Sequence, residues 1–473
     1  MQEQVLVAGA GPTGLTIGLE LARRDIPVRI VDQAAEFFAG SRGDGIQPRT
    51  LEVFDDLGVL DAVLAAGIPM PIMRVHLGGE FVGEHRMAEL VEPTPAFPHP
   101  NPWVLGQSGT EAILRERLAE FGVHVELDTA LTTFDQDATG VTATLTRDGV
   151  EETVRVAYLV GADGGRSTVR KALGIAFEGT TDESLRMLLG DVRADALDHQ
   201  FGYWFAGAEH PMEGIAMSPL PGGRQFQFAA PLTGDAEPTL EVLQEYVDRY
   251  SGRTDITLSE LTWVTVWRPN VRLAERFRVG RVFLAGDAAH VHPPTGGQGM
   301  NTGIQDAYNL GWKLAAAVHG DESQLDSYES ERRRVAAHVL GISSGLLNKL
   351  VDGDEDAMRR GPETQQLDIS YRDPADRAPL APGDRAPDAP LKDMAGNPIR
   401  LFDLFRGPHA TTLCFGETGQ LPPGSDTYAV VRPGTTAAGQ YVVDVEGHAF
   451  TAYHATDGTR VVVRPDGYLA ERS

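Results

Sequence analysis

Cysteine is almost absent from this sequence: Cys414 is the only one among 473 residues. A single cysteine excludes a disulfide within the chain and any metal centre built on several cysteines, and it suits a reducing compartment. Long apolar runs are also missing, so no segment reaches the length of a membrane span. The apolar stretch at residues 5–10 lacks the basic residues that open a signal peptide. We therefore expect a cytoplasmic protein with no metal site and no membrane partner.

Positive charge is scarce as well. Lys and Arg number 41 against 67 Asp and Glu, which gives a formal net charge of -26. This balance excludes nucleic acid and anionic membranes as partners, although it leaves room for a local site that binds an anion. The composition, 42% hydrophobic and 23% charged, is that of a globular protein, and the length exceeds what one core organises. We expect two or three domains; homo-oligomerisation is left open.

The start of the chain has the pattern strand, glycine turn, helix, strand. Residues 4–8 and 28–31 are short apolar runs, and residues 14–24 carry apolar side chains at helical spacing. This βαβ opening predicts a parallel sheet. From about residue 185 to 266 the pattern alternates as in antiparallel strands, and a buried strand with a following helix returns after residue 282. The nucleotide domain is therefore expected to be discontinuous, with a second sheet inserted into it.

The first motif is Gly-Ala-Gly-Pro-Thr-Gly at residues 9–14. Glycine at its three fixed positions allows a tight turn, close approach to a pyrophosphate and packing of the helix on the strand. The helix N-terminus then faces the phosphates. Asp32 ends the next strand, where a carboxylate accepts hydrogen bonds from a ribose. The order of these elements favours a dinucleotide site over a glycine loop without a ligand, but it does not separate FAD from NAD.

Two further motifs follow. Residues 161–170, Gly-Ala-Asp-Gly-Gly-Arg-Ser-Thr-Val-Arg, come after a strand and are by themselves compatible with a plain turn. In the third motif, Asp287 ends a buried strand and residues 293–301 form a glycine-rich loop that opens a helix. The helix N-terminus at residues 299–301 is suited to stabilising negative charge on a reduced ring. His290 and His292 lack the further ligands of a metal site, so we expect loop roles for them.

The three motifs in this order resemble the para-hydroxybenzoate hydroxylase family of single-component FAD-dependent monooxygenases, over about residues 5–334. The closer resemblance is to hydroxylases of aromatic polyketides and phenols, which carry a C-terminal thioredoxin-like domain; residues 383–388 look like its first segment. The implied fold is α/β. The expected domains are an FAD-binding Rossmann-like domain at 1–180 and 271–358, with 70–105 shaping the substrate pocket, a mostly antiparallel substrate-binding sheet at 181–270, a linker at 359–390 and a thioredoxin-like domain at 391–473.

The resemblance also implies cofactor-binding residues. Arg42 and Gln107 match positions that contact FAD, and Asp163 belongs to a motif that serves both FAD and NAD(P)H. The full expected set is Gly9, Gly11, Pro12, Thr13, Gly14, Asp32, Gln33, Arg42, Gln107, Asp163, Asp287, Pro294, Gly297, Gly299, Met300 and Asn301. Because Cys414 has no partner cysteine, the C-terminal domain is expected to be structural or to form an interface.

The implied chemistry belongs mainly to the cofactor. NAD(P)H, bound transiently, would reduce FAD, and O2 would add to give a flavin hydroperoxide that passes one oxygen to a small aromatic substrate. The residues do not identify a substrate base. Tyr203 is a weak candidate, because its hydroxyl could bind a phenolate, but aromatic clusters such as residues 203–205 are more often core.

Several functions remain open at this point. Hydroxylation in antibiotic or other polyketide biosynthesis leads, and oxygenative inactivation of an aromatic antibiotic shares the same chemistry. A flavin halogenase lacks support, because its Trp-rich motif is not found in the first third of the chain. A flavin-binding assembly or sensor protein without turnover is the alternative of another class. The second and third motifs weigh against a plain NAD-dependent dehydrogenase.

Overall fold

The computed structural model describes residues 4–182, 184–232, 234–293, 296–352, 354, 359–373, 375–424 and 426–473. The chain forms two compact units, each assembled from separate stretches of sequence. The first unit comprises Met1–Gln47, Asp61–Glu89 and Pro102–Thr364. The second comprises Pro48–Leu60, Leu90–Asn101 and Gln365–Ser473.

The centre of the first unit is a mostly parallel sheet with the strand order β20-β21-β12-β1-β2-β8. Only β20 runs antiparallel to its neighbour. The strands are short and apolar, and β1 is buried throughout, as the opening pattern predicts. Their bounds are β1 Val5–Ala8, β2 Val28–Val31, β8 Val125–Glu126, β12 Tyr158–Gly161, β20 Arg278–Val279 and β21 Val282–Leu284.

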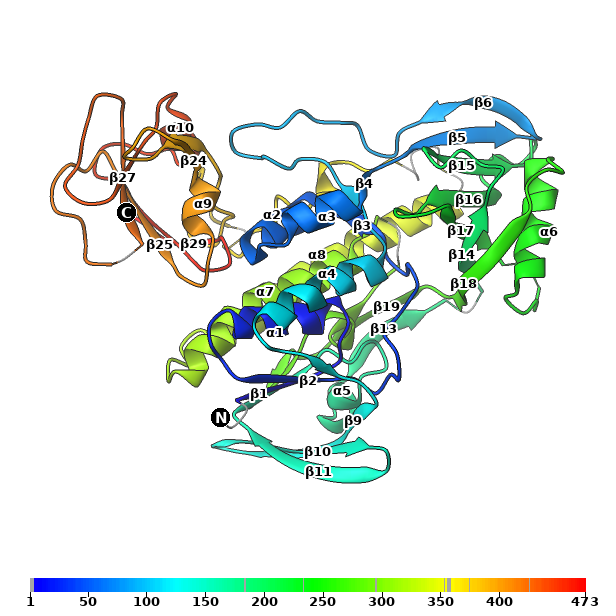
Figure 1. Cartoon of the computed structure of the whole chain (residues 1–473), viewed down its shortest axis with the longest axis horizontal. Coiled ribbons are helices and arrows are strands. Elements are labelled where there is room, and N and C mark those ends of the chain that lie inside the picture. The colour runs from blue at the N-terminus through cyan, green and yellow to red at the C-terminus, as the bar shows by residue number, and fades with distance from the viewer. Residues whose placement is uncertain are drawn as a thin grey trace. The chain divides into compact units, whose positions relative to one another are not determined.

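Helices cover one side of this central sheet, and a small antiparallel sheet, β11-β10-β9, lies on the other (Figure 1). α1 packs against α4 and α7, and α7 packs against α8. The helix bounds are α1 Pro12–Ala22, α4 Gln107–Glu120, α5 Thr168–Ala172, α7 Gly299–Val318 and α8 Leu325–Val351. The small sheet comprises β9 Thr129–Asp137, β10 Gly140–Arg147 and β11 Val150–Val156.

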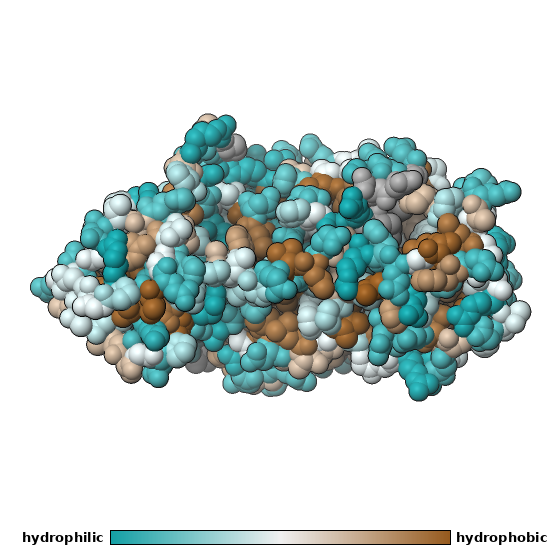
Figure 2. Space-filling view, turned by 90° about the horizontal axis from the view of Figure 1, so that it is seen from above, coloured by the Kyte–Doolittle hydropathy of each residue, from teal (hydrophilic) through white to brown (hydrophobic). Residues whose placement is uncertain are grey.

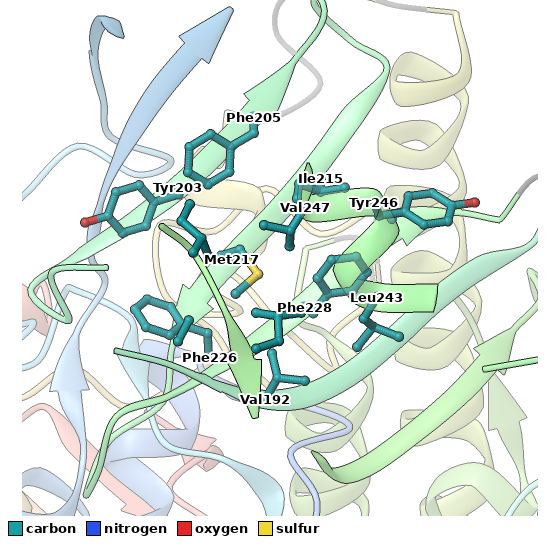
Figure 3. Packing of buried hydrophobic residues seen from close by; sticks show 14 of the residues in the cluster. Val192, Tyr203, Phe205, Ile215, Met217, Phe226, Phe228, Leu243, Tyr246 and Val247 are labelled. Atoms are coloured by element: carbon teal, nitrogen blue, oxygen red, sulfur yellow. The ribbon is translucent and has the colours of Figure 1, made fainter. Parts of the chain in front are cut away.

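A larger sheet, here called the inserted sheet, has the strand order β18-β14-β17-β16-β15-β5-β6. Only the β15–β5 pair is parallel; the other pairs are antiparallel. Its strands are β5 Ile72–Leu77, β6 Glu80–His85, β14 Met187–Ala194, β15 Phe201–Ala206, β16 Gly214–Pro219, β17 Gln225–Pro231 and β18 Leu258–Trp267. α6 (Leu240–Ser251) packs on one face, where alternate strand residues such as Phe205, Met217 and Phe228 form a core (Figure 3).

Two short sheets complete the first unit. β3 (Gly45–Ile46) and β4 (Ile68–Pro69) both pair with β7 (Trp103–Val104). β19 (Asn270–Ala274) pairs with β13 (Phe177–Thr181) and β22 (His290–Val291). The remaining short elements are α3 Leu60–Ala66, η1 Gly286–Ala288 and η3 Pro362–Thr364. Within the described residues, no helix has the length and apolarity needed to cross a membrane.

The second unit is built on a mixed sheet with the strand order β24-β23-β27-β26-β25-β28-β29. It also takes in α2 from the first part of the chain, where Glu52 is buried between Arg49 and Arg385. Cys414 is buried in β25. The elements are α2 Pro48–Leu57, β23 Pro390–Lys392, β24 Pro398–Arg400, α9 Leu401–Phe405, β25 Thr411–Phe415, β26 Thr427–Val431, β27 Tyr441–Val443, α10 His448–Ala452, β28 Arg460–Val463 and β29 Leu469–Arg472.

The observed architecture confirms the expected α/β fold class, with a Rossmann-like domain and an inserted, mostly antiparallel sheet. The inserted sheet also recruits β5 and β6, which lie far ahead of its other strands in the sequence. On the face drawn in Figure 2, apolar residues form small patches among polar ones.

Candidate cofactor and substrate site

The turn between β1 and α1 leaves bare backbone beside open space. Gly9 has φ +108°, and a Cβ there would lie 2.2 Å from the Ala162 carbonyl oxygen. A Cβ at Gly14 would lie 1.9 Å from the Gly9 oxygen, whereas one at Gly11 would meet no atom within 4 Å. Packing therefore requires the first and third glycines, and the second faces empty space at the N-terminus of α1. That is the shape a diphosphate needs at a helix N-terminus.

The neighbouring residues of this turn have different surroundings. Pro12 is the first residue of α1, where its missing N–H costs nothing. The Thr13 side chain lies against two glycines, because a Cβ at Gly286 or Gly303 would come within 2.4 Å of its Oγ1. The Thr13 side chain thus packs α1 against Gly286 of the third motif and Gly303 of α7.

Asp32 shapes the adjacent loop. Its two carboxylate oxygens accept hydrogen bonds from the backbone N–H groups of Ala10, at 2.8 Å, and Ala34, at 2.9 Å. The carboxylate is only partly buried, and each oxygen has a second lone pair, so it can still accept from a ribose hydroxyl. Gln33, the next residue, is exposed.

A small polar cluster joins the start of α4 to Arg42. Gln107 is the first residue of α4, and its Nε2 donates to Glu111 Oε1 at 2.7 Å. Burial raises the pKa of Glu111; Gln107, Arg115 and Arg42 oppose this rise. Arg42 is exposed and also acts electrostatically on Asp287, so its charge lies within reach of both carboxylates. Glu111 was not among the residues expected from the sequence, although its spacing of four residues from Gln107 is the helical signal for such a pair.

Asp287 lies on the η1 turn, which follows β21 directly. Its side chain is exposed, yet the surrounding chain desolvates the carboxylate and raises its pKa, against the opposing charges of His290 and Arg42. An accessible group that is nevertheless surrounded by protein lies within a concavity. A carboxylate there can accept hydrogen bonds from the hydroxyl groups of a ribityl chain.

A buried network holds this turn from behind. Asp306 of α7 accepts from the Gly286 N–H at 3.0 Å and from Arg332 Nε at 2.7 Å, and its Oδ2 lies 2.6 Å from His290 Nε2. Burial alone would raise the pKa of Asp306, but His290 and Arg332 hold it below its usual value. His290 therefore has the loop role expected for it.

The N-terminus of α7 is fastened to the Gly45–Ile46 strand by Asn301. Its side chain is fully buried: Oδ1 accepts from the Gln47 N–H at 2.8 Å, and Nδ2 donates to the carbonyls of Gly45 and Gly297 at 2.8 and 2.7 Å. Gly297 has φ +62°, a conformation that favours glycine.

Gly299 and Met300 begin α7, as the sequence predicts, and both are partly exposed. Their N–H groups belong to the first turn, where no partner within the helix exists. Pro294, which the resemblance also assigns to the cofactor, lies outside the described residues.

The second motif connects to the third. Asp163 Oδ2 accepts from the N–H groups of Thr168, at 2.7 Å, and Val169, at 3.2 Å, at the start of α5. Its Oδ1 is buried and has no hydrogen-bond partner within the described residues. Arg170 donates to the carbonyl of Ala288 at 2.8 Å. Asp163 thus has a capping role, with one oxygen left for a further donor.

The inserted sheet contacts the Arg42 loop through the face opposite to its core. Asp191 of β14 accepts from Ser41 N at 2.7 Å and from Ser41 Oγ at 2.6 Å. Gln227 of β17 donates to the Ser41 carbonyl at 2.9 Å and to Ser41 Oγ at 2.7 Å. Burial raises the pKa of nearby Asp44 to about 6, its own N–H and that of Gly45 oppose the rise, and the Asp191 charge adds to it. None of these four residues was expected from the sequence.

Tyr203 lies on the other face of the inserted sheet. It is 3% exposed and stacks on Phe205 within the core beneath α6 (Figure 3). Its hydroxyl donates to the Asp198 carbonyl at 3.1 Å and accepts from the Asp198 N–H at 2.8 Å. These contacts give Tyr203 a packing role and place its hydroxyl away from Ser41 and Asp191, so they do not support the weak expectation of a catalytic hydroxyl.

A Rossmann-like turn that fits a diphosphate, a carboxylate in an accessible concavity and a free helix N-terminus together define a dinucleotide-binding flavoprotein. Residues 2–343 match the family described as FAD binding domain, so the chain belongs to that family. The expected cofactor, FAD, is thereby confirmed.

Similar proteins confirm the enzyme class as well. The chain is 44% identical over 479 residues to a flavin-dependent monooxygenase of Mycobacteroides abscessus, covering 98% of this chain and 96% of that protein. It is 39% identical over 344 residues to the rifampicin monooxygenase of Streptomyces venezuelae, covering 71% and 69%. A crystal structure of aklavinone-11 hydroxylase with FAD and aklavinone superposes with a TM-score of 0.83 at 27% identity, covering 100% and 95%. The chain is an FAD-dependent monooxygenase, as the resemblance predicted.

Proposed function

We propose that this enzyme uses NAD(P)H and O2 to hydroxylate a phenolic or polyketide ring. The observation that carries the proposal is the contact of Ser41 with both Asp191 and Gln227. The contact joins the polar face of the inserted sheet to the loop that leads through Arg42 to Gly45. Asn301, in the first turn of α7, donates a hydrogen bond to the carbonyl of Gly45. A flat ring bound against this face would lie beside the helix N-terminus. The substrate of aklavinone-11 hydroxylase, a structural neighbour, supports the choice of a polycyclic ring.

The geometry supports a role in cofactor binding for several groups. Asp287 would hold the ribityl chain, the bare turn at Gly11 the diphosphate, and the first N–H groups of α7 the negative charge of the reduced ring. When bound, FAD supplies the activation of O2. Asp44, with its raised pKa and no cation paired with it in the described part of the chain, would accept the proton of a phenolic hydroxyl. The sheet and the Ser41 loop orient the ring and exclude water.

The test is NAD(P)H consumption by the purified FAD-loaded enzyme, with a panel of phenols and polycyclic aromatics. We expect one aromatic to accelerate the oxidation of NADH or NADPH and to gain one oxygen atom, which carries label when 18O2 is used. A flavin-loaded protein that no aromatic accelerates would contradict the proposal and favour a binding protein without turnover. A cytoplasmic location, in keeping with the single cysteine, is part of the proposal.

The likeness to rifampicin monooxygenase favours a second candidate with the same chemistry, oxygenation that inactivates an aromatic antibiotic. Expression of the enzyme in a sensitive bacterium would then raise the inhibitory concentration of that antibiotic. The variant Asp44→Asn should lose this protection together with turnover, while an unchanged inhibitory concentration for the wild type would restrict the enzyme to biosynthesis.

A further inference from the structure

A groove opens at one end of the inserted sheet, and no contact described above uses it. Its volume is about 390 Å³. Its walls come from the β4–β5 segment, the link between β14 and β15, and the turn between β16 and β17. The residues that matter here are Pro69, Pro71, Ile72, Arg86, His199 and Pro221.

This groove, called here the Pro69 groove, begins near the expected flavin position. Ile46 of β3 and Pro69 of β4 both pair with Trp103 of β7, so Ile46 and Pro69 are two strand spacings apart, roughly 10 Å. Gln47, which follows Ile46, is the residue whose N–H Asn301 holds at the start of α7. A ligand with one end beside α7 can therefore reach the Pro69 groove only if it is elongated.

The lining combines rigid apolar walls with one cation. Prolines and Ile72 form much of the wall, and the His199 ring is fixed by contact of its Nε2 with the Gln225 carbonyl at 2.8 Å. Arg86 is exposed and has no ion pair or hydrogen bond with any other described residue. Most arginines in the described part of this strongly acidic chain have carboxylate or carbonyl partners, for example Arg29 and Arg332, so an unpaired guanidinium in an apolar groove is available to a ligand.

The segment that carries Arg86 is held in place by a backbone contact. The backbone N–H of Arg360 donates to the carbonyl of Met87 at 2.7 Å, which fixes residue 360 beside the segment that carries Arg86. The Arg86 guanidinium therefore supplies a positive charge at the groove despite the net charge of -26. An acidic group on the ligand would complement this charge.

We propose that the Pro69 groove binds the end of the substrate farthest from the flavin, and that Arg86 selects a carboxylate or similarly acidic group there. The substrate would then be an elongated fused-ring aromatic acid rather than a single-ring phenol. This inference rests on the proposed function, because it assumes that the ring to be hydroxylated lies beside α7.

The test measures binding to the FAD-loaded enzyme by equilibrium dialysis, with 1-pyrenebutyrate and its uncharged methyl ester as probes. We expect the acid to bind about tenfold more tightly than the ester, because one charge-assisted hydrogen bond is worth roughly that factor. Arg86→Gln should weaken binding of the acid to the level of the ester and leave the ester unchanged. Arg147→Gln, at an exposed position on β10, is the matched control and should change neither.

A second variant locates the binding. Gln200 is exposed and lines the groove, so Gln200→Trp should fill part of it and weaken both probes. Equal affinities of acid and ester in the wild type, or no effect of Arg86→Gln, would refute the selection of an acid. No effect of Gln200→Trp would refute the location. Because binding is measured without turnover, these outcomes are independent of whether any aromatic accelerates NAD(P)H oxidation.

Discussion

Gly11→Ala should weaken FAD binding at the turn before α1 without destabilising the fold. The added methyl group meets no atom within 4 Å, and the backbone there, with φ -71° and ψ -179°, is open to alanine. Alanine reduces the freedom of the unfolded chain but is a poorer helix N-cap than glycine, so we expect the free energy of unfolding to change by less than about 1 kcal/mol.

The affinity for FAD should respond very differently. The same methyl group would occupy the space through which a diphosphate reaches the N–H groups of α1. Loss of one hydrogen bond to a charged group costs roughly 1.5–3 kcal/mol. We therefore expect the dissociation constant of FAD, measured by quenching of flavin fluorescence, to rise at least tenfold.

Two glycine variants are the controls. Gly207→Ala also places a methyl group in open space, but away from the turn, and should change neither stability nor FAD affinity. Gly14→Ala would bring its Cβ within 1.9 Å of the Gly9 oxygen and should destabilise the fold itself. If Gly11→Ala bound FAD as tightly as the wild type, the open space beside Gly11 would not be the diphosphate site.

Three further substitutions test other parts of the site. Asn301→Ala removes the side-chain partner of three backbone groups and should lower the free energy of unfolding, measured by urea titration, by roughly 3–5 kcal/mol. The control, Asn397→Ala, loses only exposed contacts with Asp393 and should change this free energy by less than about 0.5 kcal/mol. The folded protein holds the Asp44 proton more tightly than the unfolded chain does, so the contribution of Asp44 to stability falls by roughly 3 kcal/mol as pH rises from about 4 to about 6. The stability of Asp44→Asn relative to the wild type should therefore rise over this range, and parallel pH profiles would contradict it. Tyr203→Phe should keep full hydroxylation and lose about 1 kcal/mol of stability; loss of turnover with FAD still bound would restore a catalytic hydroxyl.

The sequence predicted those parts of the site in which local geometry dictates residue type. Gly14 is required by its contact with Gly9 within a single βαβ unit, and α7 begins at Gly299 because a glycine-rich loop precedes an apolar helical pattern. The contact that requires Gly9 is instead with Ala162, far along the chain. The contacts of Ser41 could not be predicted in this way. Its partners Asp191 and Gln227 lie 150 and 186 residues away, and only the packing of two separate sheets brings them together.

Strand alternation does not tell which face of the inserted sheet Tyr203 occupies. Alternate residues of β15 point to opposite faces, but both faces of the inserted sheet are covered, one by α6 and the other by the Ser41 loop. An aromatic residue in this strand is therefore compatible with either face. Tyr203 and Phe205 share the α6 face, and the alternation places Trp204 on the other.

At the third motif, one aspartate is accessible to the cofactor and another anchors the turn that carries it. A carboxylate that binds a cofactor hydroxyl must remain accessible, and in this motif a second carboxylate anchors the turn. Asp287 remains accessible, and burial raises its pKa. Asp306 is fully buried and carries the anchoring bonds to Gly286 and Arg332, and the cations around it hold its pKa low despite burial. Asp306→Asn would remove the carboxylate charge that Arg332 and the Gly286 N–H share, so the turn that presents Asp287 should be lost together with several kcal/mol of stability, roughly 3–5.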